Sequence, residues 1–380
     1  MHPFSSCLNT LLTTRNIKKT ALSQHLNMDR STLHQFLNGK RLPASPEIID
    51  AIASYLSLSP EEHAALKEAW IIEKITPQVY YRRRHVQSFL DSYLLGTPYS
   101  DHPSGCAICD CMDNIMDMPL PESHQLLNGK REILKYLWQI LSNEVSRPGG
   151  RIALCFQPDQ KPVMDLIRRL PSSYPFRMDH IICLNTTDEI DIRKKFHNLS
   201  LFSEILPFYR KPNATYRTFY HYDDSCAHFS ILNGMPCLFL TSDCTIVCQS
   251  DFQKGILYTC KDCVRIYWDL FRKCRQVSPQ LLHVYPVSEI NRSLIEPLEE
   301  VYIPLSPVTP TCMNICICVN EQKMAAIYNK IIFMTQEVSI LSAIRDYLTS
   351  DSEEKIFTRR NGKEFLDDLW RESCQPSLNS

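Results

Sequence analysis

The stretch KKTALSQHLNMDRSTLHQFLNGKRLP, at residues 18–43, decides the fold of the N-terminal part of the chain. Apolar side chains recur in it every three to four residues, which predicts two short helices over 18–27 and 30–37. Asn38-Gly39 ends the second helix, because both residue types favour the backbone conformations found just beyond a helix. So close a pair leaves room for only a tight turn between the two helices.

Three further helices are predicted around this pair. Residues 4–17 carry leucines at helical spacing. Two Ser-Pro pairs, which begin at Ser45 and Ser59, each predict a helix start with serine as the N-cap and proline at the first helical position. Glu62 completes a capping box with Ser59. Five short helices therefore predict a compact all-α domain over residues 1–75.

The helix predicted over 30–37 has two chemically different faces. Its apolar residues Leu33, Phe36 and Leu37 share one side. A polar face with hydrogen-bonding tips can enter the major groove of DNA, where arginine chelates guanine and glutamine chelates adenine. The alternative is a solvated helix face in a helical protein-interaction domain. The polar face carries Arg30, Ser31, His34, Gln35 and Asn38.

These residues resemble the lambda-repressor-like (Cro/CI, XRE) helix-turn-helix family, over less than a fifth of the chain. Asn27 stands at the turn where the family usually has glycine, and asparagine also tolerates the left-handed conformation needed there. Met28 matches the family's apolar plug, and Asp29 matches the N-cap of its recognition helix. Lys18 departs from the serine or threonine cap that the family often has. Further matches are Leu22-Ser23, Leu26, Arg30-Ser31-Thr32-Leu33, Asn38-Gly39-Lys40 and Pro43.

The resemblance implies a function and a set of contacts. It implies a five-helix domain that binds double-stranded DNA, in a sequence-specific transcription regulator that acts as a homodimer on paired half-sites. The residues implied to read bases are Arg30, Ser31, Thr32, His34 and Gln35. The residues implied to contact phosphates are Lys19, Asn38 and Lys40.

The charges of the first domain are divided along its sequence. Residues 1–43 hold six lysines and arginines and one acidic residue, whereas residues 44–75 hold two lysines and six acidic residues. This polarity would orient the domain on a phosphate backbone. The net charge of −1 for the whole chain gives no such indication.

Chain length and composition limit the class of protein. A chain of 380 residues is long enough for two or three domains, and its 44% apolar and 22% charged residues are typical of a globular protein. No apolar run approaches the roughly 18 residues of a membrane-spanning helix. The first twenty residues lack the pattern of a secretory leader. A cytoplasmic location without a membrane partner is therefore expected.

Beyond the first domain, strands alternate with helices, which predicts an α/β region with a largely parallel sheet. It is loosely similar to the large C-terminal regions of bacterial regulators, and an unknown effector, a ligand or a protein, is its expected input. The expected parts are a connecting helix and boundary loop over 76–124, an α/β sensor domain over 125–300 and a small α/β appendage over 301–380. The Arg82-Arg83-Arg84 run is either a solvated helix face, or a phosphate contact or linker clamp. Predicted strands lie at 151–156, 178–184, 216–222, 236–241, 245–249 and 312–319, and predicted helices at 130–145, 162–170, 188–205, 257–275, 336–349 and 362–373.

The 17 cysteines raise the question of a metal or redox site. Cys106, Cys109 and Cys111 have thiolate-ligand spacing, with His102 as a local fourth ligand for zinc. A second pair, at 260 and 263, opens a predicted helix, whose dipole would lower a thiol pKa. The segment HYDDSCAH, at 221–228, could hold a metal or a ligand. Reduced, inert cysteines are the favoured interpretation, with no metal and no cofactor, because strand cysteines such as Cys155, Cys183 and Cys237 lie in apolar patterns.

No motif supports an enzyme. GxGxxG, GxxxxGK[ST], GxSxG and HxKxxxxD are all absent from the sequence. Two alternatives to a regulator remain open, an enzyme that its helix-turn-helix domain only localises and a module whose C-terminal region binds a protein partner. The enzyme predicts clustered acid, base or nucleophile groups in a cleft, and the partner module predicts an exposed apolar patch.

Overall fold

The computed structural model divides the chain into two compact units. Among the described residues, the first unit ends at His85 and the second begins at Val86. The structure describes residues 2–94, 119–171, 173–185, 196–211, 213–223, 234–286, 300–304, 316–319, 324–328, 331–350, 357–361 and 364. No helix among these residues has the length and apolar character that crossing a bilayer requires.

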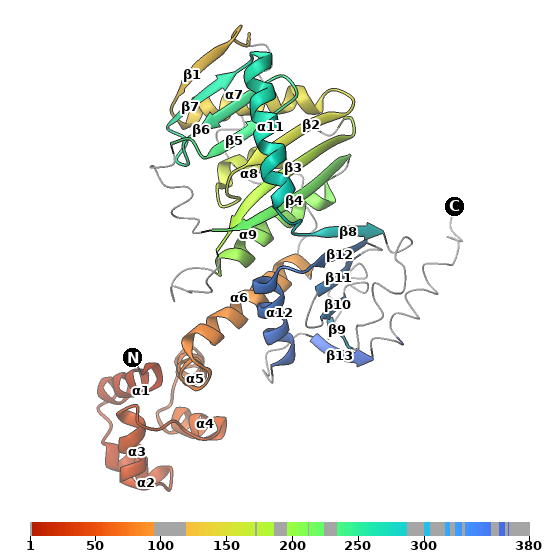
Figure 1. Ribbon diagram of the computed structural model, residues 1–380. Coiled ribbons are helices and arrows are strands. Elements are labelled where there is room, and N and C mark those ends of the chain that lie inside the picture. The colour runs from red at the N-terminus through yellow and green to blue at the C-terminus, as the bar shows by residue number, and fades with distance from the viewer. Residues whose placement is uncertain are drawn as a thin grey trace. The chain divides into compact units, whose positions relative to one another are not determined.

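The first unit is built from short helices, as the sequence predicts (Figure 1). Pro46 and Pro60 occupy first helical positions. The capping box is formed, because the Ser59 hydroxyl accepts from the Glu62 amide at 3.2 Å while the Glu62 carboxylate accepts from the Ser59 amide at 2.8 Å. Ser45 stands at the other N-cap, where its side chain hydrogen-bonds to Glu47 rather than to a backbone amide of the first turn. The helices are α1 (Pro3–Thr14), α2 (Lys19–His25), α3 (Arg30–Leu37), α4 (Pro46–Tyr55) and α5 (Pro60–Ile75).

Each of these five helices contributes to one apolar core. Phe4, Leu22, Ile49 and Leu66 have no exposed surface, although they come from four different helices. Short amphipathic helices of this length gain most of their stability from such packing rather than from intrinsic propensity. The remaining buried members are Leu8, Leu12, Leu33, Phe36, Leu37, Ile52, Leu56 and Trp70.

The predicted connecting helix is α6 (Pro77–Leu94). It begins directly after Thr76, whose positive φ of 76° ends α5. Its later residues Val86, Phe89 and Leu90 are buried in the core of the second unit, where the ring of Phe89 lies 5.8 Å from that of Phe202. The predicted boundary loop lies almost entirely outside the described residues.

The main sheet of the second unit is mixed rather than largely parallel. Its strand order is β1-β7-β6-β5-β2-β3-β4, and only β2, β3 and β4 are mutually parallel. β5, β6 and β7 follow one another through short connections, which join antiparallel strands. The strands are β1 (His124–Asn128), β2 (Gly150–Cys155), β3 (Phe176–Leu184), β4 (Ala214–Tyr222), β5 (Cys237–Leu240), β6 (Thr245–Cys248) and β7 (Lys254–Tyr258).

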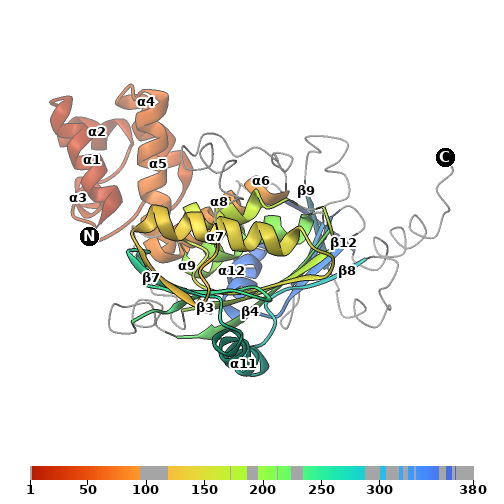
Figure 2. The same cartoon turned by 90° about the horizontal axis from the view of Figure 1, so that it is seen from above.

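Helices cover this sheet unequally. α7 (Lys130–Val145), α8 (Lys161–Arg168) and α9 (His197–Ile205) lie on one face, and α11 (Lys261–Val277) crosses the other (Figure 2). A 3₁₀ turn, Leu206–Arg210, follows α9. Because side chains alternate along a strand, even-numbered residues of β2 and β3 face the larger helical layer and odd-numbered residues face α11.

A second sheet is antiparallel throughout its described pairs, in the order β13-β9-β10-β11-β12-β8. The strand predicted at 312–319 is present as β10, and the helix predicted at 336–349 is present as α12. The helix predicted at 362–373 falls almost wholly outside the described residues. The elements are β8 (His283–Pro286), β9 (Glu300–Pro304), β10 (Cys316–Val319), β11 (Met324–Tyr328), β12 (Ile331–Thr335), α12 (Val338–Thr349) and β13 (Phe357–Asn361).

Candidate nucleic-acid interface

The turn between α2 and α3 has the geometry that the sequence predicts. Asn27 has a φ of +48°, in the left-handed region that asparagine tolerates better than most residues. Leu26 and Met28, on either side of it, pack against the core of the first unit. The turn is therefore fixed at both flanks, and it sets the angle at which α3 leaves α2.

The C-terminal end of α3 is tied to α1. The last carbonyls of a helix have no partner within the helix and need one from elsewhere. The Leu37 carbonyl accepts hydrogen bonds from the Ser5 hydroxyl and from the Asn9 amide, the latter at 2.8 Å. Leu33 and Phe36 are buried beside it. Three buried side chains and two hydrogen bonds thus hold α3 as a rigid element.

The opposite face of α3 is open to solvent. Its side chains combine one guanidinium, one imidazole, one hydroxyl and two amides, which are the donors and acceptors that read base edges. The Asn38 amide lies 3.0 Å from Nδ1 of His34, so these two predicted contact residues form a pair one helical turn apart. Thr32 is half-buried, which makes it the least accessible of the predicted base readers. The exposed residues are Arg30, Ser31, His34, Gln35 and Asn38.

The predicted phosphate-contacting lysines flank α3 on both sides. Lys19 is the first residue of α2, and Lys40 follows α3; both are exposed and form no ion pair within residues 2–94. Gly39 turns the chain here with a φ of +67°. The loop that follows α3 is fixed by the indole N–H of Trp70, which donates to the Pro43 carbonyl at 2.9 Å. Asp29 stands at the N-cap of α3, although its side chain forms no cap hydrogen bond.

The acidic half of the first unit uses its carboxylates internally. Glu62 binds Arg15 at 2.6 Å, and this hydrogen bond lowers the pKa of Glu62 below its ordinary value. Asp50 lies 2.8 Å from His63, and Glu73 accepts from the Phe4 amide at 3.0 Å. These contacts leave the lysines beside α3 as cations without a carboxylate of the domain to neutralise them.

The Arg82-Arg83-Arg84 run has a partner in the same unit. The guanidinium of Arg84 lies 3.0 Å from Glu68, and the Tyr80 hydroxyl donates to the same carboxylate at 2.9 Å. Arg84 therefore connects α6 to α5, which favours a linker clamp over a phosphate contact for this residue.

Most of the other sequence candidates lie outside the part of the chain that the structure describes. Cys106, Cys109, Cys111 and His102 lie outside the described residues, as do residues 224–228 of HYDDSCAH. Within the described residues, no three histidine, cysteine or acidic side chains converge as metal ligands would. Cys260 is the N-cap of α11, which begins four residues later than the predicted helix over 257–275. Its hydrogen bond to Cys263 raises the pKa of the Cys263 thiol, whereas a helix dipole was expected to lower it.

The strand cysteines are placed as the sequence predicts. Cys183 and Cys237 are buried, and desolvation raises the pKa of Cys155 to about 12. The Cys155 thiol therefore holds its proton at neutral pH, which makes it a poor nucleophile and a poor metal ligand.

Comparison with known proteins identifies the first unit. A family of Cro/C1-type helix-turn-helix DNA-binding domains matches residues 8–64, which include α2, the Asn27 turn and α3. Residues 8–64 are thus a Cro/C1-type helix-turn-helix DNA-binding domain, and the resemblance inferred from residues 18–43 is confirmed. No curated protein matches the chain in sequence.

Two solved structures show weak likeness to the whole chain. One is the archaeal chromatin protein TrmBL2, described as showing a novel mode of DNA binding, with 9% identity over 64% of this chain and 86% of that chain and a TM-score of 0.27. The other is polyphosphate kinase from Porphyromonas gingivalis, with 12% identity over 73% of this chain and 61% of that chain and a TM-score of 0.27. At these TM-scores neither likeness supports a conclusion about fold or function.

Proposed function

We propose that the protein is a sequence-specific transcription regulator, in which α3 reads bases and the second unit senses an effector without catalysing a reaction. One observation carries the proposal: α3 presents a continuous hydrogen-bonding face while its apolar face and its C-terminal carbonyl are fixed in the core. A helix anchored in this way can insert its polar face into the major groove without losing its own packing.

Individual roles follow from the chemistry of this face. Arg30, at the N-terminus of α3, suits the two acceptors on guanine, and Gln35, further along the same helix, suits the donor and acceptor on adenine. Lys19 and Lys40 suit the phosphates on either side of the groove. In this proposal two copies of the chain bind as a homodimer, because one short helix reads too few base pairs to select a site in a genome.

The proposal is tested with the full chain. Selection from a random duplex library gives the preferred site, and fluorescence anisotropy then measures affinity for that site and for a scrambled duplex. We expect a symmetric consensus and tighter binding to it than to the scrambled duplex, with two chains per duplex by analytical ultracentrifugation. Failure to retain any duplex at low salt contradicts DNA recognition, and one chain per duplex contradicts the homodimer alone.

A matched control separates specific contacts from net charge. Lys67, in the acidic half of the first unit, is replaced by alanine with the same loss of one charge as Lys19→Ala. We expect Lys67→Ala to bind the selected duplex as the unaltered chain does, while Lys19→Ala binds every duplex more weakly.

A further inference from the structure

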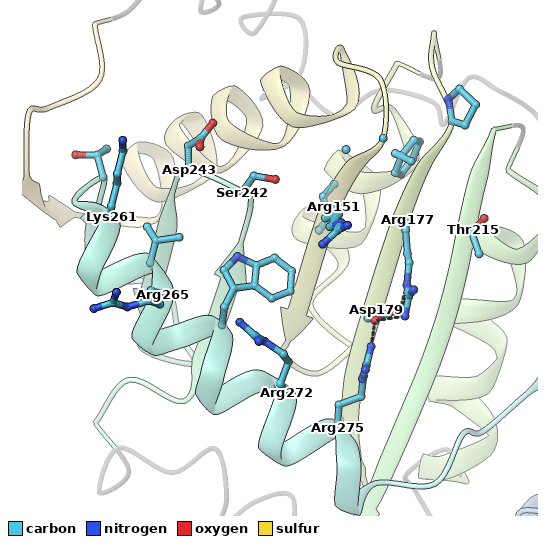
Figure 3. A pocket seen from close by; sticks show the side chains of 18 residues that line it. Arg151, Arg177, Asp179, Thr215, Ser242, Asp243, Lys261, Arg265, Arg272 and Arg275 are labelled. Carbon is cyan, nitrogen blue, oxygen red and sulfur yellow. Dashed lines mark hydrogen bonds and ion pairs between the residues drawn. The ribbon is translucent and has the colours of Figure 1, made fainter.

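A basic cleft lies in the second unit, between α11 and the first residues of β2, β3 and β4 (Figure 3). Its volume is about 1070 Å³. Two of its lining residues are acidic, Asp179 and Asp243, and six are basic. The basic residues are Arg151, Arg177, Lys261, Arg265, Arg272 and Arg275.

The sheet supplies its share of these cations through strand register. Arg151 on β2 is the register partner of Arg177 on β3, and Arg177 in turn is the partner of Thr215 on β4. The three residues therefore form a row across the sheet on the face that α11 covers. Two arginines directly opposite each other repel, so this pairing costs stability unless an anion neutralises it.

The helix supplies its share through a repeat of alternating four and three residues. Lys261, Arg265, Trp268, Arg272 and Arg275 follow this spacing, which places them along one stripe of α11. Two aspartates of α11 form ion pairs with arginines three residues later, Asp262 with Arg265 at 3.0 Å and Asp269 with Arg272 at 3.1 Å. All four side chains remain more than half exposed.

The carboxylates of the cleft are already shared or engaged. Asp179 is buried and binds three arginines, Arg217 and Arg275 at 2.8 Å and Arg177 at 3.2 Å. Figure 3 shows Arg177 and Arg275 converging on this one carboxylate from β3 and from α11. Asp243 binds Arg147, outside the cleft, at 2.6 Å.

Two cations of the cleft are not paired with any carboxylate that the structure describes. Within the part of the second unit that the structure describes, Arg151 and Lys261 are exposed and form no ion pair. The cleft thus holds fixed positive charge that the protein itself does not neutralise, and a concave surface of one sign concentrates counter-ions.

We propose that this cleft binds a small molecule that carries two or more phosphate groups. Arginine forks match phosphate oxygens in pairs, and five of the six cations are arginines. Asp179 already joins Arg177 to Arg275, and the remaining cations, Arg151 on β2 and Lys261, Arg265 and Arg272 on α11, come from both walls of the cleft. A ligand with several phosphate groups can therefore pair with more of them than a single phosphate can. The volume suits a small molecule. Trp268, whose indole N–H donates to the Thr241 carbonyl at 2.9 Å, gives the organic part of such a ligand an apolar wall. The site does not depend on the proposed regulatory function.

Isothermal titration of the full chain tests the site, at roughly physiological salt of about 0.15 M. The probes are inorganic triphosphate, ATP and inorganic monophosphate, all without metal. We expect one triphosphate or one ATP per chain, with monophosphate at least tenfold weaker because a single phosphate group pairs with fewer of the cleft cations. Tighter binding of ATP than of triphosphate would show that the nucleoside contributes to affinity, through the wall at Trp268. Equal binding would show that the phosphates account for the affinity. Either result supports the site.

Matched variants locate the binding. Arg151→Ala removes a cleft cation that holds no ion pair, and we expect it to weaken triphosphate at least about tenfold. Arg131→Ala removes an exposed arginine from α7, on the opposite face of the sheet, and leaves binding unchanged (Figure 2). Lys261→Ala is the second cleft variant if Arg151→Ala does not fold, as judged by circular dichroism.

Three outcomes overturn the proposal. They are the absence of heat with triphosphate and ATP at millimolar concentration, equal loss of binding in Arg131→Ala, and preferential Arg151-dependent binding of a single-stranded oligonucleotide, which would assign the cleft to nucleic acid. Arg30→Ala is titrated in parallel and keeps triphosphate binding, so that a failure of DNA recognition and a failure of this site are told apart.

Discussion

The two units of the protein keep their ionisable groups in different places. Within residues 2–85, the buried polar side chains are the two small hydroxyls of Ser5 and Ser23, and the charged groups lie at the surface. The described part of the second unit buries acidic, basic and imidazole side chains, two of them on β3 and three in or beside helices, and each forms a hydrogen bond or an ion pair. They are Glu144, Asp179, His180, Lys211 and Glu337.

Because of this difference, we expect that binding residues can be replaced without loss of stability in the first unit but not in the second. On α3 a contact residue such as Arg30 can be replaced without disturbing the core, because the apolar face and the Leu37 carbonyl hold the helix. Beside α11, Arg177 and Arg275 serve the fold through Asp179 and line the cleft at the same time. We therefore expect substitutions to change DNA binding alone in the first unit, and stability together with ligand binding in the second.

The largest expected effect is that of Asp179→Asn. The substitution keeps the shape of the side chain but removes the negative charge that three arginines share, so we expect the second unit to lose about 3–5 kcal/mol of unfolding free energy. Urea unfolding followed by near-ultraviolet circular dichroism measures it. Asp243→Asn is the control: its carboxylate is 74% exposed in its pair with Arg147, and its loss costs less than about 1 kcal/mol. Equal effects of the two substitutions would show that the arginine cluster does not depend on its carboxylate.

The next effect is a dependence of stability on pH in the second unit. His180 is fully buried, and desolvation lowers its pKa from 6.5 to about 4. The backbone carbonyl of Phe156 accepts from Nε2 at 3.0 Å, which leaves Nδ1 to accept from the Tyr216 hydroxyl at 2.8 Å, so the folded state holds the neutral ring.

The unfolded chain binds a proton at this histidine below pH 6.5, whereas the folded chain does so only near pH 4. The stabilisation is therefore complete above pH 6.5 and declines as the pH falls toward 4, by about 3 kcal/mol in total. Urea unfolding at a series of pH values measures this slope. His180→Gln keeps one donor and one acceptor and flattens it. An unchanged slope in that variant would assign the acid sensitivity to other groups.

A smaller effect is expected at the polar face of α3. Arg30→Ala or Gln35→Ala is expected to cost roughly 1–3 kcal/mol of binding to the selected duplex and to relax the preference at one base position. Thermal unfolding should be unchanged, because both side chains are exposed. Selection with each variant gives the new consensus. A loss of stability that parallels the loss of affinity would end the contrast between the two units.

The smallest effect is expected at the phosphate contacts. Lys19→Ala is expected to weaken binding to all duplexes alike and to reduce the slope of log affinity against log salt by about 0.9, the share of one phosphate. Anisotropy titrations at several salt concentrations measure both quantities. A change in sequence preference, with the salt slope unaltered, would make Lys19 a base-reading residue.

The helix-turn-helix was predictable because its signals are local. Asn27, Met28 and the leucines of α2 and α3 lie within one short stretch, and each makes its structural contribution to the turn or to the adjacent core. The capping box at Ser59 was predictable for the same reason, since both of its partners lie in one helical turn. Whether the polar residues of α3 read bases stays a prediction.

The sheet of the second unit was less predictable because its order depends on distant pairings. Leu257 and Tyr258, the last two residues of β7, were placed in the predicted helix over 257–275, since a short apolar run fits either period. The pairing of β7 with β1 and β6 decides that they belong to a strand. The basic cleft escaped prediction for a related reason. Arg151 and Arg177 become neighbours only through the register of β2 with β3. The spacing of cations along residues 261–275 was the one signal that the sequence alone offered.

The hydrogen bonds that Ser5 and Asn9 donate to the Leu37 carbonyl also bear on the speed of DNA binding. A recognition helix that is already locked to its neighbour has no folding step to complete on encounter. The association rate constant is then set by diffusion and by the electrostatic attraction between the lysines and the phosphates. It is nearly the same for the selected duplex and for other duplexes. The difference in affinity between the two kinds of duplex then comes from their dissociation rates.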